Sequence, residues 1–280
     1  MCILDVSSWR EEFNKQASGT RVKYWIIDPQ TSHEYMFKIP RENTGEAWAE
    51  KISSEIGKLL GLSMVDVHLA VRKNIYGIIA KKFTSGTEEF YEGGDLITSI
   101  VDEFDRYKLD YYNFENISKV LKEFQLDKEF VAIPIFDALI GNQDRHCDNW
   151  GIIRTKTGYR LAPIYDNGAS LGFQLKEERI KLMLKDSNMF KAFTNRSYSL
   201  IGIGGKKKPK HMELLSVIRK KYPKEVEKEM DRLVLLDRDN VIHLLNTIPS
   251  SIMSDIYKEW VEKLLLFRKE WILTWRNGSE

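Results

Sequence analysis

Side chains able to hold a metal ion are concentrated in two short segments of the sequence. Residues 141–149 read Gly-Asn-Gln-Asp-Arg-His-Cys-Asp-Asn, and residues 166–168 read Asp-Asn-Gly. Carboxylate and carboxamide oxygens suit Mg²⁺, which usually takes one or two protein oxygens and completes its octahedron with phosphates and water. Asn149 and Asp166 are the two candidate ligands, and Asp144 is a further carboxylate in the first segment. Such a site requires that the fold bring the two segments together.

A predicted β-hairpin over residues 151–162 supplies that connection. Two short apolar runs flank the sequence Thr-Lys-Thr-Gly, which is typical of a turn between paired strands. Pairing of Arg154 with Tyr159 would place Asn149 opposite Ile164, two residues before the Asp-Asn-Gly turn. We therefore expect both candidate ligands at the same end of a rigid ribbon.

Residues 141–149 allow two interpretations other than a magnesium site. The segment could be an Asx-rich turn that caps a helix, which is the commoner role of such residues. It could also bind a metal through Asp144, His146 and Asp148, although alternating residues on one short loop rarely complete a metal site. The magnesium interpretation is favoured because only it accounts for the matched position of Asp166.

The elements before residue 84 predict a small lobe rich in strands. Apolar and β-branched residues indicate the strands, and turn residues lie between them. A stripe of apolar side chains at helical spacing indicates one helix. The predicted strands are 22–28, 34–39, 65–71 and 76–83, and the predicted helix is 45–60. Residues 84–94 are polar and contain glycine, which is typical of a connector.

Helical periodicity dominates the rest of the chain. The predicted helices are 114–124, 128–141, 211–221, 224–236 and 252–275, interrupted by the hairpin at 151–162. The sequence therefore predicts an α+β, bilobed fold, with a β-rich lobe over residues 1–84 and a larger helical lobe over residues 85–280.

Lys38 lies inside a predicted strand and is flanked by apolar residues. One interpretation is an edge-strand lysine that discourages pairing with other chains. The other places its ammonium group on the phosphates of a nucleotide, where a glutamate from the following helix would hold it. Glu46, Glu50 and Glu55 are available on that helix, and Glu50 is preferred because Glu46 could equally stabilise the helix dipole from the first turn.

Composition indicates a globular protein of the reducing cytosol. The 280 residues include 43 Lys and Arg against 41 Asp and Glu, so the global charge indicates nothing about a nucleic-acid or membrane partner. The basic run 206–210 is typical of a solvated loop, and direct binding to nucleic acid is not expected. Two cysteines, Cys2 and Cys147, do not form a disulfide framework. The longest apolar stretch, 130–141, is too short to span a membrane. We expect a cytoplasmic location.

The spacing of the candidate residues resembles that of protein kinases. There, a loop aspartate precedes a metal-binding asparagine by five positions, and an Asp-x-Gly turn follows a hairpin; Asp144, Asn149 and Asp166 match this spacing. Between residues 16 and 170 the chain is similar to the HipA family of bacterial serine/threonine kinases, which includes toxin kinases. The resemblance rests on Ser18-Gly19-Thr20-Arg21-Val22-Lys23, Phe37-Lys38-Ile39-Pro40, Asn142-x-Asp144-Arg145-His146-x-x-Asn149 and Leu161-Ala162-Pro163-x-Tyr165-Asp166.

The resemblance implies a protein-kinase-like fold with ATP and Mg²⁺ as cofactors. Asp144 would be the general base that takes the proton of the substrate hydroxyl, and Asn149 and Asp166 would hold the metal. The implied nucleotide-site residues are Ser18, Gly19 and Lys23 in a loop over the triphosphate, Lys38 on the phosphates with Glu50 as its partner, Lys82 and Phe83 in the adenine-binding hinge, and His146 as a residue that orders the catalytic loop.

Two departures from the family pattern bear on regulation. The chain begins almost at the nucleotide loop, so it resembles the short, core-only members that lack an extra N-terminal domain. Gln16 occupies the position of the family's self-phosphorylated serine, which leaves Ser18 and Thr20 as the nearby hydroxyls. No Ala-Pro-Glu element follows Asp166, so a eukaryotic-type activation segment is not expected.

The sequence thus predicts a serine/threonine protein kinase acting on an unidentified protein, and the resemblance allows an antitoxin-like regulatory partner. A small-molecule phosphotransferase of the aminoglycoside- or choline-kinase type would use the same chemistry. A nucleotide-binding regulatory module without catalysis is a third interpretation, but every residue needed for transfer is present. A purely structural domain would leave the spacing of the candidate residues as coincidence.

Overall fold

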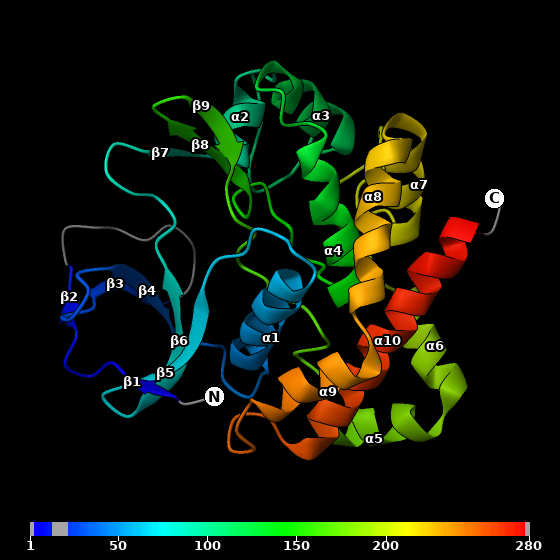
Figure 1. Ribbon diagram of the computed structural model, residues 1–280. Helices are drawn as coiled ribbons and strands as arrows, with labels where there is room; N and C mark the ends of the chain where they lie inside the picture. The colour runs from blue at the N-terminus through cyan, green and yellow to red at the C-terminus, as the bar shows by residue number, and fades with distance from the viewer. Residues whose placement is uncertain (1–2, 13–21, 278–280) are drawn as a thin grey trace.

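Two lobes are visible in the computed structural model, which describes residues 3–12 and 22–277 (Figure 1). The strands are β1 (Leu4–Asp5), β2 (Arg10–Glu11), β3 (Lys23–Ile27), β4 (Glu34–Lys38), β5 (Val67–Arg72), β6 (Ile75–Lys81), β7 (Glu89–Glu92), β8 (Gly151–Thr155) and β9 (Gly158–Leu161). The α-helices are α1 (Glu46–Leu59), α2 (Gly93–Thr98), α3 (Phe114–Glu123), α4 (Ala132–Ile140), α5 (Glu177–Lys185), α6 (Ser187–Asn195), α7 (His211–Lys221), α8 (Pro223–Arg232), α9 (Arg238–Asn246) and α10 (Asp255–Asn277), with short 3₁₀ helices at Glu129–Val131 and Leu233–Leu235. The bilobed α+β architecture is confirmed, and the boundary at residue 84 stays a prediction.

The small lobe is built on one six-stranded sheet with the order β1-β5-β6-β4-β3-β2. Its strands pair antiparallel, except that β1 runs parallel to β5. The predicted hairpins are confirmed, including the turn at Lys73 and Asn74, where both residues have positive φ (50° and 66°). Strand β4 lies between β3 and β6, so the interpretation of Lys38 as an edge-strand residue is wrong.

Helix α1 forms because its apolar side chains share one stripe, and that stripe packs against the sheet. Trp48, Ile52 and Ile56 are buried in the main hydrophobic core, together with residues of β5 and β6. Alternate strand residues point to the opposite face and form a second, small core of Val6, Ile26, Phe37, Ala70 and Ile79. In Figure 1, α1 lies between the sheet and the helical lobe, so it contacts both.

The helical lobe contains a second sheet with the order β7-β8-β9. The predicted hairpin has the expected register, with Arg154 opposite Tyr159. Strand β7 was not predicted, because we expected residues 84–94 to form a connector. Its partner β8 lies about sixty positions further along the chain and becomes available only in the folded protein, with Phe90 opposite Ile153.

Most long helices match the predicted ranges, whereas α2, α5, α6 and α9 were not predicted. These helices have six to nine residues and bury few apolar side chains; α5 buries Ile180 and Met183. Helix α4 is buried along its length and ends at Gly141, whose φ of 66° is the left-handed conformation that glycine favours at helix C-termini. The catalytic loop expected from the sequence begins at that glycine.

His211, at the start of α7, gives a test of the packing behind this loop. The side chain is buried, and burial together with the nearby Arg268 guanidinium lowers its pKa to about 3. Because the folded state keeps this histidine neutral, the protein should lose stability as pH falls below about 6.5, by about 1.4 kcal/mol per pH unit. Denaturant titrations between pH 6.5 and pH 4.5 should show a smaller loss for His211→Gln. Equal losses in the two proteins would mean that His211 does not contribute this pH dependence.

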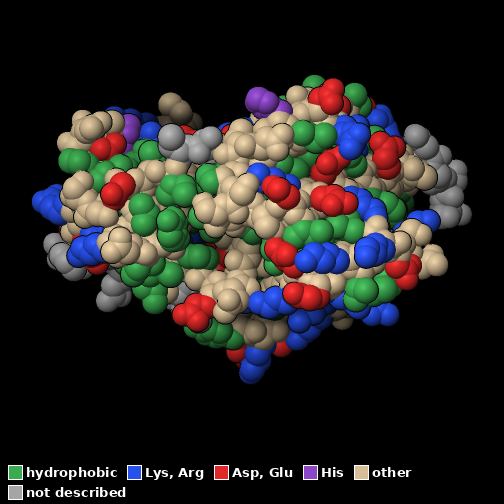
Figure 2. Space-filling model, turned by 90° about the horizontal axis from the view of Figure 1, so that it is seen from below, with side chains coloured by type: hydrophobic (Ala, Val, Ile, Leu, Met, Phe, Trp, Pro, Cys, Tyr) green, Lys and Arg blue, Asp and Glu red, His purple; other side chains and the backbone are tan. Residues whose placement is uncertain are grey.

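Acidic and basic side chains are intermixed on the face of the molecule shown in Figure 2. Ion pairs outside the core include those of Arg276 with Glu227 (2.6 Å) and of Arg238 with Glu262 (2.7 Å). Within residues 3–12 and 22–277, no helix combines the length and the apolar composition needed to cross a membrane.

Candidate active site

Asp166 lies in a strained turn beside Lys38. Its φ of 58° is left-handed, a conformation uncommon for residues other than glycine and often associated with functional sites. The Lys38 ammonium group donates to Oδ1 of Asp166 over 3.0 Å. The charge of Lys38 is the main cause that lowers the pKa of Asp166 to about 2, and Lys23 adds to it. Asp166 is therefore an ionised carboxylate at neutral pH.

Lys23 and Lys38 are directly opposite each other on β3 and β4. Like charges at opposite positions of an antiparallel pair repel each other unless anions lie nearby. Asp166 supplies one negative charge at this position. The arrangement gives a small positive region next to the Asp166 turn, suited to a ligand with several negative charges.

Glu50 reaches the same turn from α1. Its side chain is buried, and burial raises its pKa, while the charge of Lys38 opposes that rise. The backbone N–H of Gly168 donates to the Glu50 carboxylate. Glu46, one helical turn earlier, instead accepts from the N–H of Arg41 (2.8 Å). Glu55 accepts from Lys51 and Lys58, so of the three glutamates considered from the sequence Glu50 is the one beside Lys38.

The loop after α4 is held in shape around Asp144. The N–H of Asp144 donates to Oδ1 of Asn142 (3.0 Å), and its carbonyl oxygen accepts from Nδ2 of Asn149 (2.9 Å) and from the N–H of His146 (2.8 Å). These bonds tie the loop to itself, and the Asp144 side chain is exposed. The two ends of the Asp-x-x-x-x-Asn spacing thus lie in direct contact.

Arg145 connects this loop to the Asp166 turn. The guanidinium group is buried and carries five N–H donors, each of which has a partner. Nε and Nη2 bond both oxygens of Asp137 (3.0 and 2.7 Å), Nη2 also bonds Oδ1 of Asn167 (2.7 Å), and Nη1 bonds the carbonyls of Asn149 (2.9 Å) and Tyr165 (2.7 Å). One side chain therefore binds the residues on either side of Asp166 and the backbone of Asn149.

The predicted extension of the hairpin to Asn149 and Ile164 is wrong. The ribbon ends where the N–H of Ala162 bonds the carbonyl of Gly151 (2.9 Å), and Ile164 pairs instead with Met64 in the segment after α1. Pro163 follows directly and cannot donate to a ladder, which helps the strand to leave its partner. In place of the strand pairing, Arg145 joins the backbone of Asn149 to the residues on either side of Asp166, and a metal site shared by Asn149 and Asp166 stays a prediction.

The sequence contains an indication, independent of the motif spacing, that Arg145 has a buried acidic partner. Asp137 is the acidic residue inside the otherwise apolar helix α4, and a buried carboxylate needs a cationic or hydrogen-bonding partner. Arg145 stands eight positions later, within the motif that contains Asp144. The pair could have been proposed from these two residues, although its bonds to Asn167 and Tyr165 could not.

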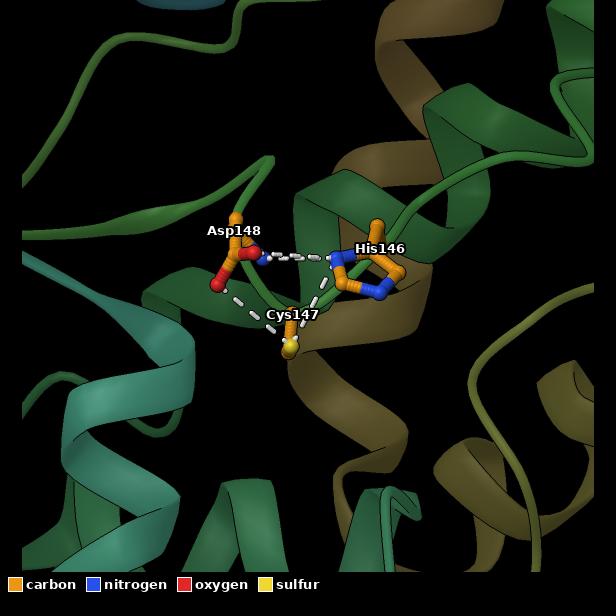
Figure 3. A group of neighbouring side chains, drawn as sticks. All are labelled: His146, Cys147 and Asp148. Carbon is orange, nitrogen blue, oxygen red and sulfur yellow. Dashed lines mark hydrogen bonds and ion pairs between the residues drawn. The ribbon is translucent and has the colours of Figure 1, made fainter. Parts of the chain in front are cut away.

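His146 lies beside Cys147 and Asp148, and its ring points toward the side chains of both (Figure 3). Its Nε2 bonds the carbonyl of Arg106 (2.8 Å), and Nδ1 lies 3.3 Å from the Asp148 carboxylate, which raises the pKa of His146. Asp148 also pairs with the Arg106 guanidinium (2.8 Å). These contacts fasten the loop 141–149 to the segment before α3, and the loop-ordering role of His146 in catalysis stays a prediction.

The cluster of His146, Cys147 and Asp148 has the residue types of a metal site but does not suit one. Burial raises the pKa of the Cys147 thiol, which disfavours the thiolate that metals bind. His146 and Asp148 are already engaged with Arg106. Asp144, the third ligand of the alternative metal site considered from the sequence, is not part of this cluster.

The remaining predicted nucleotide residues lie at the other end of the site or outside the described residues. Lys82 forms an ion pair with Glu34 at the end of β6. The ring of Phe83 stacks on Tyr165, the residue before Asp166, at 5.5 Å between centroids. The connector thus touches the Asp166 turn, and its adenine-binding role stays a prediction. Ser18 and Gly19 fall outside the described residues.

The chain is similar to proteins of known family and known structure. Residues 15–231 match the HipA-like C-terminal domain family. The serine/threonine-protein kinase CtkA of Helicobacter pylori is 26% identical over 270 residues, covering 85% of this chain and 77% of its own. The crystal structure of the proinflammatory kinase CtkA of H. pylori aligns with a TM-score of 0.82 at 23% identity, over 98% of this chain and 97% of that one. HipA of Shewanella oneidensis MR-1, in complex with HipB and operator DNA, aligns with a TM-score of 0.54 at 13% identity, over 95% and 68%.

The bilobed fold is shared with CtkA, which is named a serine/threonine-protein kinase, in agreement with the protein-kinase-like fold that the sequence predicted. The chain belongs to the HipA-like C-terminal domain family, since the match covers most of its length.

Proposed function

We propose that this protein is a serine/threonine protein kinase that transfers the γ-phosphoryl group of ATP, with Mg²⁺, to a hydroxyl group of another protein. One observation carries the proposal: Arg145 joins the backbone of Asn149 to the residues on either side of Asp166, while Asp166 pairs with Lys38. Catalysis of phosphoryl transfer depends mainly on such positioning and on charge neutralisation.

The donor set fits a magnesium ion. Asp166 is ionised at neutral pH because of Lys38. The amide nitrogen of Asn149 donates to the carbonyl of Asp144, which leaves its carboxamide oxygen as the group that would face a metal. One carboxylate and one carboxamide are a suitable protein contribution for Mg²⁺, whose other ligands are usually phosphates and water. When bound, the ion would neutralise charge on the phosphates.

The nucleotide phosphates would lie against Lys38 and Lys23. Lys23 and Lys38 are opposite each other, and Glu50 is close to Lys38. A polyanion between the two lysines would relieve the repulsion between their positive charges. Lys38 would change partner from Asp166 toward the phosphates as the metal takes the carboxylate. The hinge at Lys82 and Phe83 would hold the adenine, and the loop containing Ser18 and Gly19 would cover the triphosphate.

Asp144 would act as the general base. Its exposed side chain projects from a loop whose backbone is fixed by Asn142 and Asn149. A carboxylate in this position can accept the proton of an incoming hydroxyl and orient the oxygen toward the γ-phosphate. CtkA, which matches over 85% of this chain, is named a serine/threonine-protein kinase, and this name supports a protein hydroxyl as the acceptor.

A regulatory partner and a cytoplasmic location belong to the proposal as predictions. The HipA structure includes HipB and operator DNA, and an antitoxin-like partner is the corresponding expectation for this chain.

Replacement of Asp166 by alanine tests the metal site. Asp166→Ala removes a carboxylate that is partly exposed, so the fold should persist while binding of Mg²⁺ with ATP is lost. In a thermal melt, wild type should gain stability from ATP only together with Mg²⁺, and the variant should not. Asp186→Ala, on the N-cap of α6, is a control for removal of an acidic group elsewhere. A magnesium-dependent shift of wild-type size in Asp166→Ala would contradict the ligand assignment.

A further inference from the structure

Helix α1 bears two adjacent buried serines that bond in different directions. The Ser54 hydroxyl donates to the carbonyl of Val65 (2.7 Å), in the segment that follows the same helix. The Ser53 hydroxyl lies 3.0 Å from that of Ser170, a residue more than one hundred positions away and just after the Asp166 turn. Ser53 thus contacts the catalytic half of the molecule, whereas Ser54 bonds locally.

The direction of the serine bonds follows from their partners. Ser170 donates its proton to the carbonyl of Asn167 over 2.6 Å, and a carbonyl can only accept. The Ser170 oxygen therefore accepts from Ser53. Asn167 in turn accepts from Arg145 through its side-chain oxygen (2.7 Å).

These bonds form one buried chain between the lobes. It runs from Ser53 through Ser170 and Asn167 to Arg145, and from there to Asp137 on α4. Each of these residues is at most 1% exposed. Hydrogen bonds in such a dry environment are strong, and a partner left unpaired there is costly.

We propose that the Ser53–Ser170 hydrogen bond is an interlobe latch that sets the position of α1 relative to the metal-binding turn, and that both serines are positioning residues for Mg²⁺ and ATP. This inference rests on the proposed function. Glu50 and Ser53 are one helical turn apart and both bond the segment 166–170, Glu50 through the N–H of Gly168. Fixing Ser53 therefore also fixes Glu50 next to Lys38.

Ser53→Ala and Ser54→Ala form a matched pair for the test. Both remove one buried hydroxyl from the same helix, so both should lower the melting temperature to a similar extent. Loss of one hydrogen bond should change the relevant equilibrium by about 2- to 10-fold. We expect Ser53→Ala to raise, by about that factor, the ATP and Mg²⁺ concentrations that give half of the maximal thermal shift, and likewise KM for ATP in the transfer assay, with little change for Ser54→Ala. Indistinguishable magnesium and ATP dependence in the two variants would overturn the latch.

A double-mutant cycle with Ser170→Ala tests whether the two serines act together. If they form the latch, Ser53→Ala should have little further effect on KM or magnesium dependence in the Ser170→Ala background. Fully additive effects would contradict the coupling. Asp166→Ala, measured alongside, separates the two proposals: wild-type magnesium and ATP binding in that variant would refute the metal site of the proposed function, whereas loss of binding there with no effect of Ser53→Ala would refute the latch alone.

Discussion

Asp144→Asn should transfer phosphate about 10²–10⁴-fold more slowly than wild type, the usual range for loss of a positioned general base. Asparagine keeps the size of the side chain, and the bonds that shape the loop use the backbone of residue 144 and therefore persist. The variant cannot accept the hydroxyl proton as a carboxylate does. The measurement is the rate of transfer from labelled ATP to protein at saturating Mg²⁺.

Nucleotide binding is the control for this variant. Lys38, Asn149 and Asp166 are unchanged in Asp144→Asn, so the thermal shift produced by ATP and Mg²⁺ should match that of wild type. Asn142→Ala provides a second comparison, because it removes the bond to the N–H of Asp144 but leaves the carboxylate. A wild-type rate of transfer by Asp144→Asn would contradict the assigned mechanism.

Arg145→Met should be the most destabilising single change among the residues of the site. It removes five hydrogen bonds and leaves the buried Asp137 carboxylate without its cationic partner. Breaking a buried pair in this way costs about 3–5 kcal/mol, a large part of the about 5–15 kcal/mol that stabilises a typical domain. Denaturant unfolding should show a correspondingly lower midpoint, or no folded protein.

Arg154→Met is the matched control for this substitution. Arg154 pairs with Glu89 at the surface, and about half of each side chain is exposed. Surface pairs contribute about 0–1 kcal/mol, so this variant should unfold almost as wild type does. Similar losses of stability in the two variants would mean that the buried bonds of Arg145 do not hold the catalytic loop and the Asp166 turn together.

The candidate site was largely predictable because its residues cluster in sequence. Asp144, Asn149 and Asp166 follow a fixed spacing on either side of a hairpin, and a hairpin is a local structure that turn residues and strand patterns indicate well. The proximity of Lys38 and Glu50 was predictable for a similar reason, because the two residues lie in a strand and in the helix that follows it in the sequence. The strand and helix patterns of the small lobe were likewise strong enough to predict its hairpins.

Contacts between distant segments were not predictable from patterns of this kind. The pairing of Ile164 with Met64, the addition of β7 to β8, and the bond between Ser53 and Ser170 depend on tertiary packing. A serine in a helix carries no sign of its partner, and Ser53 and Ser54 look alike in the sequence. The role of Arg145 is intermediate, because its charge partner Asp137 was visible but its carbonyl partners were not.

The most direct test of the proposed function is transfer from γ-labelled ATP, with Mg²⁺, to the proteins of a cell lysate, followed by phosphoamino-acid analysis. Wild type should place label on serine or threonine of one or more proteins, and Asp144→Asn should place almost none. The same reaction with amine substrates in place of the lysate should yield no labelled product. Label confined to small molecules, or equal protein labelling by wild type and Asp144→Asn, would contradict a protein kinase that uses Asp144 as its base.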